Sequence, residues 1–245
     1  MTEARIGTEE MQVEVYSVRL NASPGHAGPM NELLSEEEQL RAQRFKFAHL
    51  TDLFVQTHAA LRILVARKLR VEPGGILFST GAFGKPRIDR APEFGFNLSH
   101  SGNMAVFAFA SDCNVGVDVE QIRELNDFEE IIHRYFSIAE IEEFRSVEPG
   151  LRKDAFFNGW TRKEAYIKAK GEGLSIPLDS FSVSLRPGAA PTLTVPCALD
   201  SREEWQIEEL KPAAGYVGAL VYSGERRAMN VHETLDMDSL WNGSR

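Results

Sequence analysis

The sequence has few cysteines and too little positive charge for several common classes of protein. Cys113 and Cys197 are its two cysteines, far apart and without CxxC spacing, which excludes a disulfide framework and a zinc motif. Its 27 Lys and Arg against 36 Asp and Glu give a formal net charge of −9. Phosphate contacts demand a basic surface, so the charge argues against a nucleic-acid-binding protein. Any anionic ligand must meet a local group of cations.

The sequence also lacks long apolar segments. No run of 18 apolar residues could cross a bilayer as a helix, so no membrane partner is expected. The first residues include Glu3, Glu9 and Glu10, where a secretory signal would have a basic start and an apolar core. We therefore expect a soluble, cytoplasmic protein.

The predicted elements occur twice in the same order: a strand, a short helix, a long helix and further strands. Each short helix begins with a capping box, formed by Ser35 with Glu38 and by Ser137 with Glu140. The predicted strands lie at 13–20, 76–79, 94–97, 104–110, 115–120, 181–185, 205–210 and 216–222, and the first long helix at 51–70. This repeat predicts an α/β (α+β) fold of two similar halves.

The boundary between the halves is expected near Cys113. Residues 1–112 would form the N-terminal α/β half and residues 113–245 the C-terminal α/β half. After about residue 225 the sequence loses its periodicity, and residues 236–245 in particular are expected to form a loose tail.

The segment from Val115 to Glu120 carries a candidate metal site. Its alternating valines predict a strand whose valine face is buried, while Asp118 and Glu120 share the other face. At a rise of about 3.3 Å per residue their Cα atoms stand roughly 7 Å apart, which suits one shared divalent cation. Taken alone, two alternating carboxylates are more often the solvated face of a strand.

The segment from Trp160 to Lys168 predicts a helix that Gly171 ends. The i, i+4 spacing stacks Trp160, Glu164 and Lys168 on one stripe, so Glu164 is a candidate third carboxylate. The alternative is that Glu164 and Lys168 form a surface ion pair worth roughly 0.3–0.5 kcal/mol.

These two segments belong to a larger pattern. With Gly84-Lys85-Pro86 and the run from Phe96 to Ser101 upstream, they resemble the Sfp-type 4′-phosphopantetheinyl transferases in order and spacing, over about residues 35–222. The resemblance implies two related halves packed about a pseudo-twofold axis, with coenzyme A bound in the cleft between them. It also implies transfer of the 4′-phosphopantetheine arm of coenzyme A to a serine of an apo acyl or peptidyl carrier protein, releasing adenosine 3′,5′-bisphosphate.

The resemblance assigns roles to named residues. Asp118, Glu120 and Glu164 would hold Mg²⁺, and Glu164 would also act as the base, directly or through a metal-bound water. Lys168 would neutralise charge on the pyrophosphate. The residues implied to contact coenzyme A are Arg41 at the 3′-phosphate, Lys85 in a nucleotide-binding loop, Ser99 and His100 in a loop after a strand, Asp118 and Lys168.

Alternatives remain open at this point. His100 alone would more often be a surface histidine. Arg44 and Lys46 lie where the match to the family loosens; they are candidate substitutes for a cationic contact, but such residues are more often solvated cations on a helix. The rival functions are a non-enzymatic module that binds coenzyme A or a carrier protein, and a Mg²⁺-dependent hydrolase of nucleotide pyrophosphates. A monomer is expected, because two halves of one chain build the site.

Overall fold

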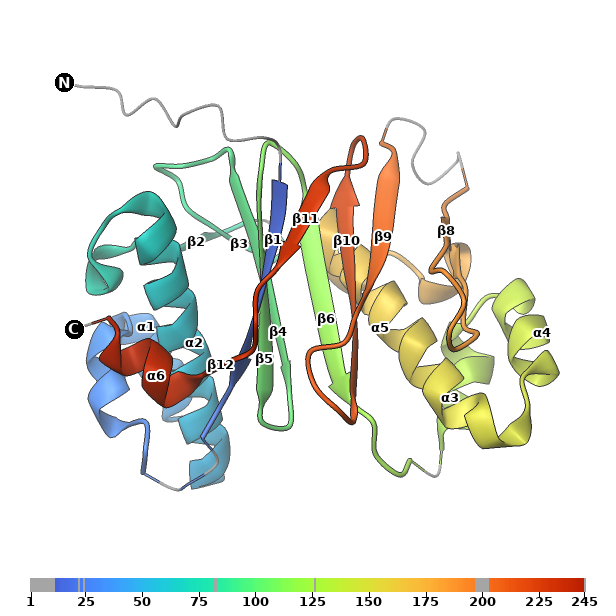
Figure 1. The fold of residues 1–245 in the computed structure, drawn as a ribbon, viewed down its shortest axis with the longest axis horizontal. Helices are drawn as coiled ribbons and strands as arrows, with labels where there is room; N and C mark the ends of the chain where they lie inside the picture. The colour runs from blue at the N-terminus through green and yellow to red at the C-terminus, as the bar shows by residue number, and fades with distance from the viewer. Residues whose placement is uncertain are drawn as a thin grey trace.

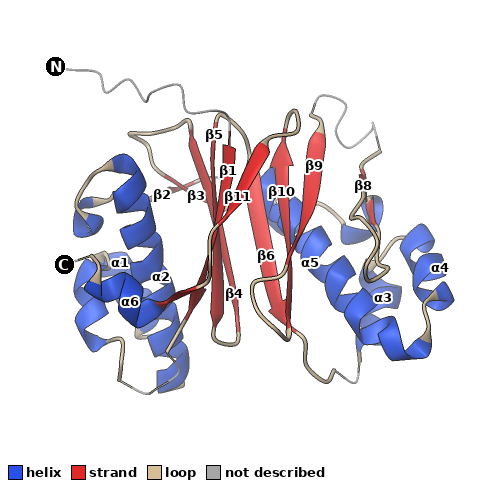
Figure 2. Cartoon of the chain, viewed as in Figure 1, coloured by secondary structure: helices blue, strands red, loops and turns tan. Residues whose placement is uncertain are grey.

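The computed structural model describes residues 12–21, 23, 25–81, 83–125, 127–196 and 203–244. The predictions that concern Glu3, Glu9, Glu10, Cys197 and Arg245 lie outside the described residues. Two β-sheets pack against each other in the middle of the molecule, and helices cover their two outer sides (Figures 1 and 2). No helix in the described ranges is long and apolar enough to span a bilayer.

The first sheet has the strand order β11-β1-β5-β4, and β12 also pairs with β1. Its strands are β1 (Gln12–Arg19), β4 (Phe94–Ser101), β5 (Met104–Ser111), β11 (Ala228–Val231) and β12 (Leu235–Asp236). β5 runs antiparallel to β1 and β4, whereas β11 and β12 run parallel to β1. The helices α1 (Glu36–Ala42) and α2 (Ala48–Leu69) lie on its outer side (Figure 1).

The second sheet is antiparallel, with the order β6-β10-β9. Its strands are β6 (Val115–Gln121), β9 (Trp205–Leu210) and β10 (Tyr216–Ser223). The helices α3 (Phe128–Tyr135), α4 (Ile138–Ser146) and α5 (Arg152–Lys170) cover its outer side.

Several short elements complete the description. They are η1 (Gly28–Leu33), η2 (Pro73–Gly75), β2 (Ser79–Thr80), β3 (Pro86–Arg87), η3 (Pro149–Leu151), η4 (Gly173–Ser175), η5 (Leu178–Ser180), β7 (Ser182–Val183), β8 (Leu193–Thr194) and α6 (Met237–Asn242).

Apolar side chains fill the space between each pair of layers. One cluster lies between α2 and the first sheet, another between α5 and the second sheet, and another between the two sheets. The cluster between the sheets contains Val115, Val117 and Val119, so the valine face of β6 is buried as the sequence predicts. The alternating residues Gly116, Asp118 and Glu120 are therefore on the other face.

The predicted internal repeat is visible in matched ion pairs. Both predicted capping boxes are present, at the starts of α1 and α4. In the first half, Glu38 of the capping box pairs with Arg62 of α2 at 2.7 Å. In the second half, Glu140 pairs with Lys163 of α5 at 2.8 Å. The α/β fold with two similar halves is confirmed.

The prediction of a loose tail is wrong. β11 and β12 add to the edge of β1, and α6 follows directly. Met237 is 1% exposed and Leu240 2% exposed, in the apolar cluster under α2. Figure 1 shows this C-terminal segment, residues 228–242, crossing back to the first half. Leu235 and Trp241 pack against the same cluster, whereas Met229 and Val231 are exposed. The division between residues 112 and 113 stays a prediction.

Three predicted strands differ clearly from the observed ones, among them the strand expected at 181–185, which is reduced to β7 at Ser182–Val183. The strand expected at 76–79 is reduced to β2 at Ser79–Thr80, because Ile76 turns inward after a 3₁₀ turn. The strand expected at 94–97 extends to Ser101, because β4 pairs with β5 along its whole length. Ser99 and His100 therefore lie within a strand and not in the loop that we expected.

Candidate active site

Strand β6 and helix α5 touch at Gly116. A Cβ atom built at Gly116 would lie 2.2 Å from the carbonyl oxygen of Ala165 and from the amide nitrogen of Ala169. Only glycine permits this approach of helix backbone to strand. Glu164 and Lys168, one turn apart on α5, are thereby brought beside the carboxylate face of β6.

Asp118 is the centre of a buried polar cluster. Its Oδ1 atom accepts hydrogen bonds from Ser99 Oγ at 2.7 Å and from Lys168 Nζ at 2.7 Å. Lys168 Nζ also donates to Ser99 Oγ at 2.9 Å. The other oxygen, Asp118 Oδ2, is buried and has no hydrogen-bond partner in the described part of the chain. One oxygen of this carboxylate is thus held by two donors, and the other oxygen is the candidate ligand atom.

Glu120 is held in a similar way two residues further along β6. Ser101 Oγ donates to Glu120 Oε2 at 2.7 Å, and Arg123 lies 3.3 Å from the same oxygen. The hydroxyls of Ser99 and Ser101 come from β4 in the first half, whereas both carboxylates come from β6 in the second half. Asn97, on the same face of β4, accepts the amide N–H of Val117 at 2.9 Å.

Glu164 is the third carboxylate of the cluster. Burial raises the pKa of its side chain, the carboxylates of Asp118 and Glu120 raise that pKa further, and the ammonium of Lys168 opposes the shift. The structure therefore brings the three predicted carboxylates within electrostatic reach of one another. In the ranges that the structure describes, no group of three or more His, Cys, Asp or Glu side chains is already arranged as a metal site.

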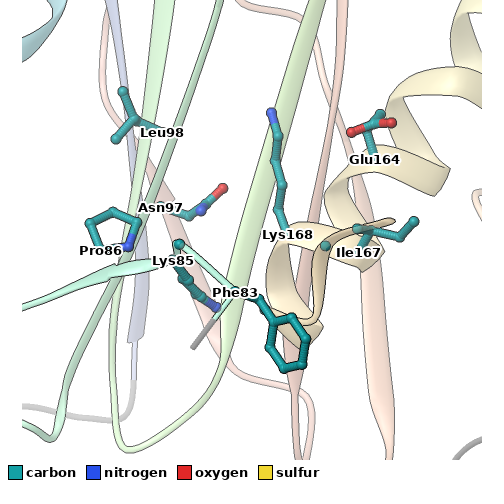
Figure 3. A pocket seen from close by; sticks show the side chains of 11 residues that line it. Phe83, Lys85, Pro86, Asn97, Leu98, Glu164, Ile167 and Lys168 are labelled. Carbon is teal, nitrogen blue, oxygen red and sulfur yellow. The ribbon is translucent and has the colours of Figure 1, made fainter. Parts of the chain in front are cut away.

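A cavity of about 270 Å³ opens beside this cluster. Glu164, Ile167 and Lys168 line it from α5, and Asn97 and Leu98 line it from β4. In Figure 3 the side chains of Glu164 and Lys168 stand on α5 across from Asn97 and Leu98. The loop from Phe83 to Pro86, the neighbouring Gly171 and Gly173 complete the lining. The cavity is thus shared by both halves.

Lys85 lines this cavity, but its ammonium group is directed at backbone. Lys85 Nζ donates to the carbonyl oxygen of Val115 at 3.0 Å and to that of Ala169 at 2.8 Å. Burial lowers the pKa of Lys85 to about 8. The side chain thereby ties the loop of the first half to the start of β6 and the end of α5. The contact of Lys85 with a nucleotide stays a prediction.

Arg41 and His100 are exposed side chains of the first half, and both act on His58. Burial is the main cause that lowers the pKa of His58; the hydrogen bond to the backbone of Phe54 and the charge of Glu38 oppose the shift, and the charge of Arg41 adds to it. Arg41 also lies over the ring of Phe54, 5.4 Å from its centroid. Arg41 and His100 are thus both near His58 of α2. Arg44 and Lys46 are exposed nearby in sequence.

Ser101 and Asn97 were missed as site residues by the sequence reasoning. The available signal was the alternation of polar residues at 97, 99 and 101, which places three side chains on one face of a strand. A strand that ends at residue 97, as the sequence predicts, leaves residues 99 and 101 outside it, so the prediction does not place the three side chains together.

Comparisons with known proteins show which proteins this chain resembles. The model of the 4′-phosphopantetheinyl transferase superfamily matches residues 114–221. The chain is 33% identical over 216 residues to the 4′-phosphopantetheinyl transferase HetI of Nostoc sp. (strain PCC 7120), an alignment that covers 87% of this chain and 88% of HetI. It is 32% identical over 183 residues to the 4′-phosphopantetheinyl transferase Sfp of Bacillus subtilis (strain 168), covering 75% and 79%. The solved ACPS–CoA complex of Chronobacterium ammoniagenes matches 47% of this chain and 98% of its own, with 18% identity and a TM-score of 0.36.

Proposed function

The chain belongs to the 4′-phosphopantetheinyl transferase superfamily, and from this premise we propose how its own residues carry out the transfer. The enzyme moves the 4′-phosphopantetheine group of coenzyme A to a serine of an apo carrier protein. The serine oxygen bonds to the phosphorus on the pantetheine side of the pyrophosphate, and the bond to the leaving adenosine 3′,5′-bisphosphate breaks. Such a step needs charge neutralisation and in-line positioning more than covalent help.

Asp118, Glu120 and Glu164 would hold Mg²⁺. Two observations support this assignment: Asp118 Oδ2 is a buried acceptor without a partner in the described chain, and the pKa of Glu164 is raised by its burial and by the two other carboxylates. A bound cation would give Asp118 Oδ2 a partner and would favour the ionised form of Glu164. Hard carboxylate oxygens are the ligands that Mg²⁺ prefers. When bound, Mg²⁺ would neutralise charge on the pyrophosphate.

Lys168 is the cation that this chain supplies at the same place. Its ammonium is fixed between Asp118 and Ser99, yet its side chain remains 29% exposed and lines the cavity. An ammonium has three protons to donate, and two of them are used here, so one remains for a phosphate oxygen of coenzyme A. We assign to Lys168 the neutralisation of the charge that develops on the 5′-phosphate of the leaving adenosine 3′,5′-bisphosphate.

Glu164 is the best candidate for the base. Its side chain lines the cavity together with Lys168, next to the proposed cation site, where the carrier serine would meet the pyrophosphate of coenzyme A. A carboxylate oxygen of Glu164 would take the proton of the carrier serine as the new P–O bond forms. One observation carries the proposal: Glu164 is within electrostatic reach of Asp118, whose Oδ2 atom has no hydrogen-bond partner among the described residues.

Arg41 and His100 would bind the 3′-phosphate of coenzyme A. Arg41 is an exposed cation that lies over Phe54, and Arg41 and His100 both interact electrostatically with His58, so the two side chains lie near the same part of α2. Lys85 is proposed to contribute through the position of its loop, because its ammonium is engaged with two carbonyl groups.

The test is intact mass spectrometry of an apo carrier protein incubated with the enzyme, coenzyme A and Mg²⁺. A mass gain of one phosphopantetheine group, lost in excess chelator and with Asp118→Asn or Glu164→Gln, supports the proposal. Cleavage of coenzyme A without a mass gain would mean a hydrolase, and tight binding without either product would mean a binding module. Transfer undiminished by chelator would refute the Mg²⁺ assignment.

We also infer a monomer and a cytoplasmic location. A single chain supplies β4 from one half and β6 and α5 from the other, so a second copy is not needed to complete the site. Light scattering after size-exclusion chromatography measures the mass directly, and a dimer at working concentration would overturn the monomer.

A further inference from the structure

The strands β4 and β6 are joined by side chains where the two sheets meet. They are edge strands of different sheets. Ser99 and Ser101 alternate on β4, and Asp118 and Glu120 alternate on β6. The two cross-links match, with each serine hydroxyl donating to the carboxylate opposite at 2.7 Å. The half that lacks the carboxylates thus supplies the groups that orient them.

The hydroxyl of Ser101 has a defined direction. Its oxygen accepts the amide N–H of Gln121 at 3.1 Å, which leaves its single proton for Glu120 Oε2. Ser101 is 9% exposed, so water competes little for this bond. Arg123 reaches the same oxygen of Glu120. Both partners therefore hold Oε2, and no hydrogen bond to Oε1 is found in the part of the chain that the structure describes.

We propose that Ser101 is a positioning residue for the transfer reaction: it fixes the carboxylate of Glu120 so that Oε1 faces the cation site. The inference rests on the proposed Mg²⁺ assignment. Ser101 is better suited to a test than Ser99, because the hydroxyl of Ser99 also bonds to Lys168, whereas that of Ser101 bonds, among the described residues, only to Glu120 and the backbone of Gln121.

The experiment compares Ser101→Ala, Ser101→Thr and the control Ser223→Ala. Ser223 is a strand serine of similar burial, 7% exposed, whose hydroxyl also accepts a backbone N–H, from Asn114 at 3.0 Å, and it is outside the carboxylate cluster of β6. Mn²⁺ binding in the presence of coenzyme A is measured by electron paramagnetic resonance. The Mg²⁺ dependence of carrier modification and the thermal midpoint of each variant are measured in parallel.

Ser101→Ala should weaken Mn²⁺ binding about 10- to 100-fold, the usual effect of removing a group that orients a metal ligand. The Mg²⁺ concentration for half-maximal rate should rise in proportion, while kcat at saturating Mg²⁺ stays near that of the wild type. Ser101→Thr keeps the hydroxyl and should restore the affinity. Ser223→Ala should leave Mn²⁺ binding unchanged.

Unchanged Mn²⁺ affinity in a folded Ser101→Ala variant would overturn the inference, as would equal weakening in Ser223→Ala. If Ser101→Ala does not fold, Ser101→Cys takes its place, because it keeps the size of the side chain and offers Glu120 a weaker donor. It should weaken Mn²⁺ binding in the same direction, and unchanged binding there would overturn the inference. Wild-type transfer that survives excess chelator would remove the premise and the inference with it.

Discussion

Replacing the side chain of Lys163 should lower the stability of the folded protein more than most single substitutions do. Its ammonium donates to the carbonyl oxygens of Leu178 and Phe181 at 2.6 and 2.9 Å, and it lies 2.8 Å from Glu140 Oε2. The side chains of Lys163 and Glu140 are 0% and 1% exposed. Burial lowers the pKa of Lys163, and the charge of Glu140 opposes that shift.

Lys163→Met keeps the length of the side chain but removes its charge and its three donors. Glu140 would retain the backbone N–H groups of Ser137 and Val183, at 2.6 and 2.8 Å, but would remain a buried charge without a counterion. Removing one partner of a buried ion pair costs about 3–5 kcal/mol. For a chain of 150–250 residues each kcal/mol lowers Tm by roughly 2–4 °C, so the variant should melt about 6–20 °C lower.

Thermal and urea denaturation of the purified variant measure this loss. Lys153→Met, on the same helix, is the matched control, because its partner Glu124 is 87% exposed. An exposed pair contributes about 0–1 kcal/mol, so the control should melt within about 4 °C of the wild type. Adding Glu140→Gln to Lys163→Met should recover part of the loss by removing the unpaired charge. A Lys163→Met variant as stable as the control would refute the reasoning.

Three further outcomes are expected. Gly116→Ala should lower the free energy of unfolding by about 1–3 kcal/mol or more and reduce transfer, since its Cβ would lie 2.2 Å from the backbone of α5; a urea melt measures it. Glu164→Gln should abolish transfer while the metal-free protein stays folded. Because folding raises the pKa of Glu164, the stability of the wild type falls as the pH rises from the pKa of the unfolded state to that of the folded state. Thermal melts of the variant across that pH range should not show this fall. Arg41→Ala should raise KM for coenzyme A at least about tenfold, because a charged hydrogen bond of about 1.5–3 kcal/mol is lost, but it should hardly change KM for dephospho-coenzyme A; equal rises would show that Arg41 does not bind the 3′-phosphate.

The parts of the site that the sequence predicts are those with local signals. The alternation of Val115, Val117 and Val119 defines the buried face of β6, and the spacing of Glu164 and Lys168 defines one stripe of α5. Gly171 ends that helix with a left-handed φ of +74°, as predicted. Each of these signals depends on residues within one element, so no knowledge of the partner element is needed.

The parts that could not be predicted depend on partners distant in sequence. Ser99 and His100 lie in a strand because β5 pairs with β4 as far as Ser101. The ammonium of Lys85 binds the carbonyl of Ala169, 84 residues later. Residues 228–242 become ordered because the edge of β1 is available to them. No window of the sequence contains both sides of any of these contacts.

The C-terminal segment also sets an order of events during synthesis. The ribosome delivers β1, α2, β4 and β5 long before residues 228–242, yet Met237 and Leu240 fill the apolar cluster of that first half, and His232 donates its amide N–H to Val15 at 2.9 Å. Until then the nascent first half presents the open edge of β1, which is a template for pairing with other chains. A chain stalled after β10 would therefore be a substrate for chaperones and proteases even though every residue of the carboxylate cluster had already been made.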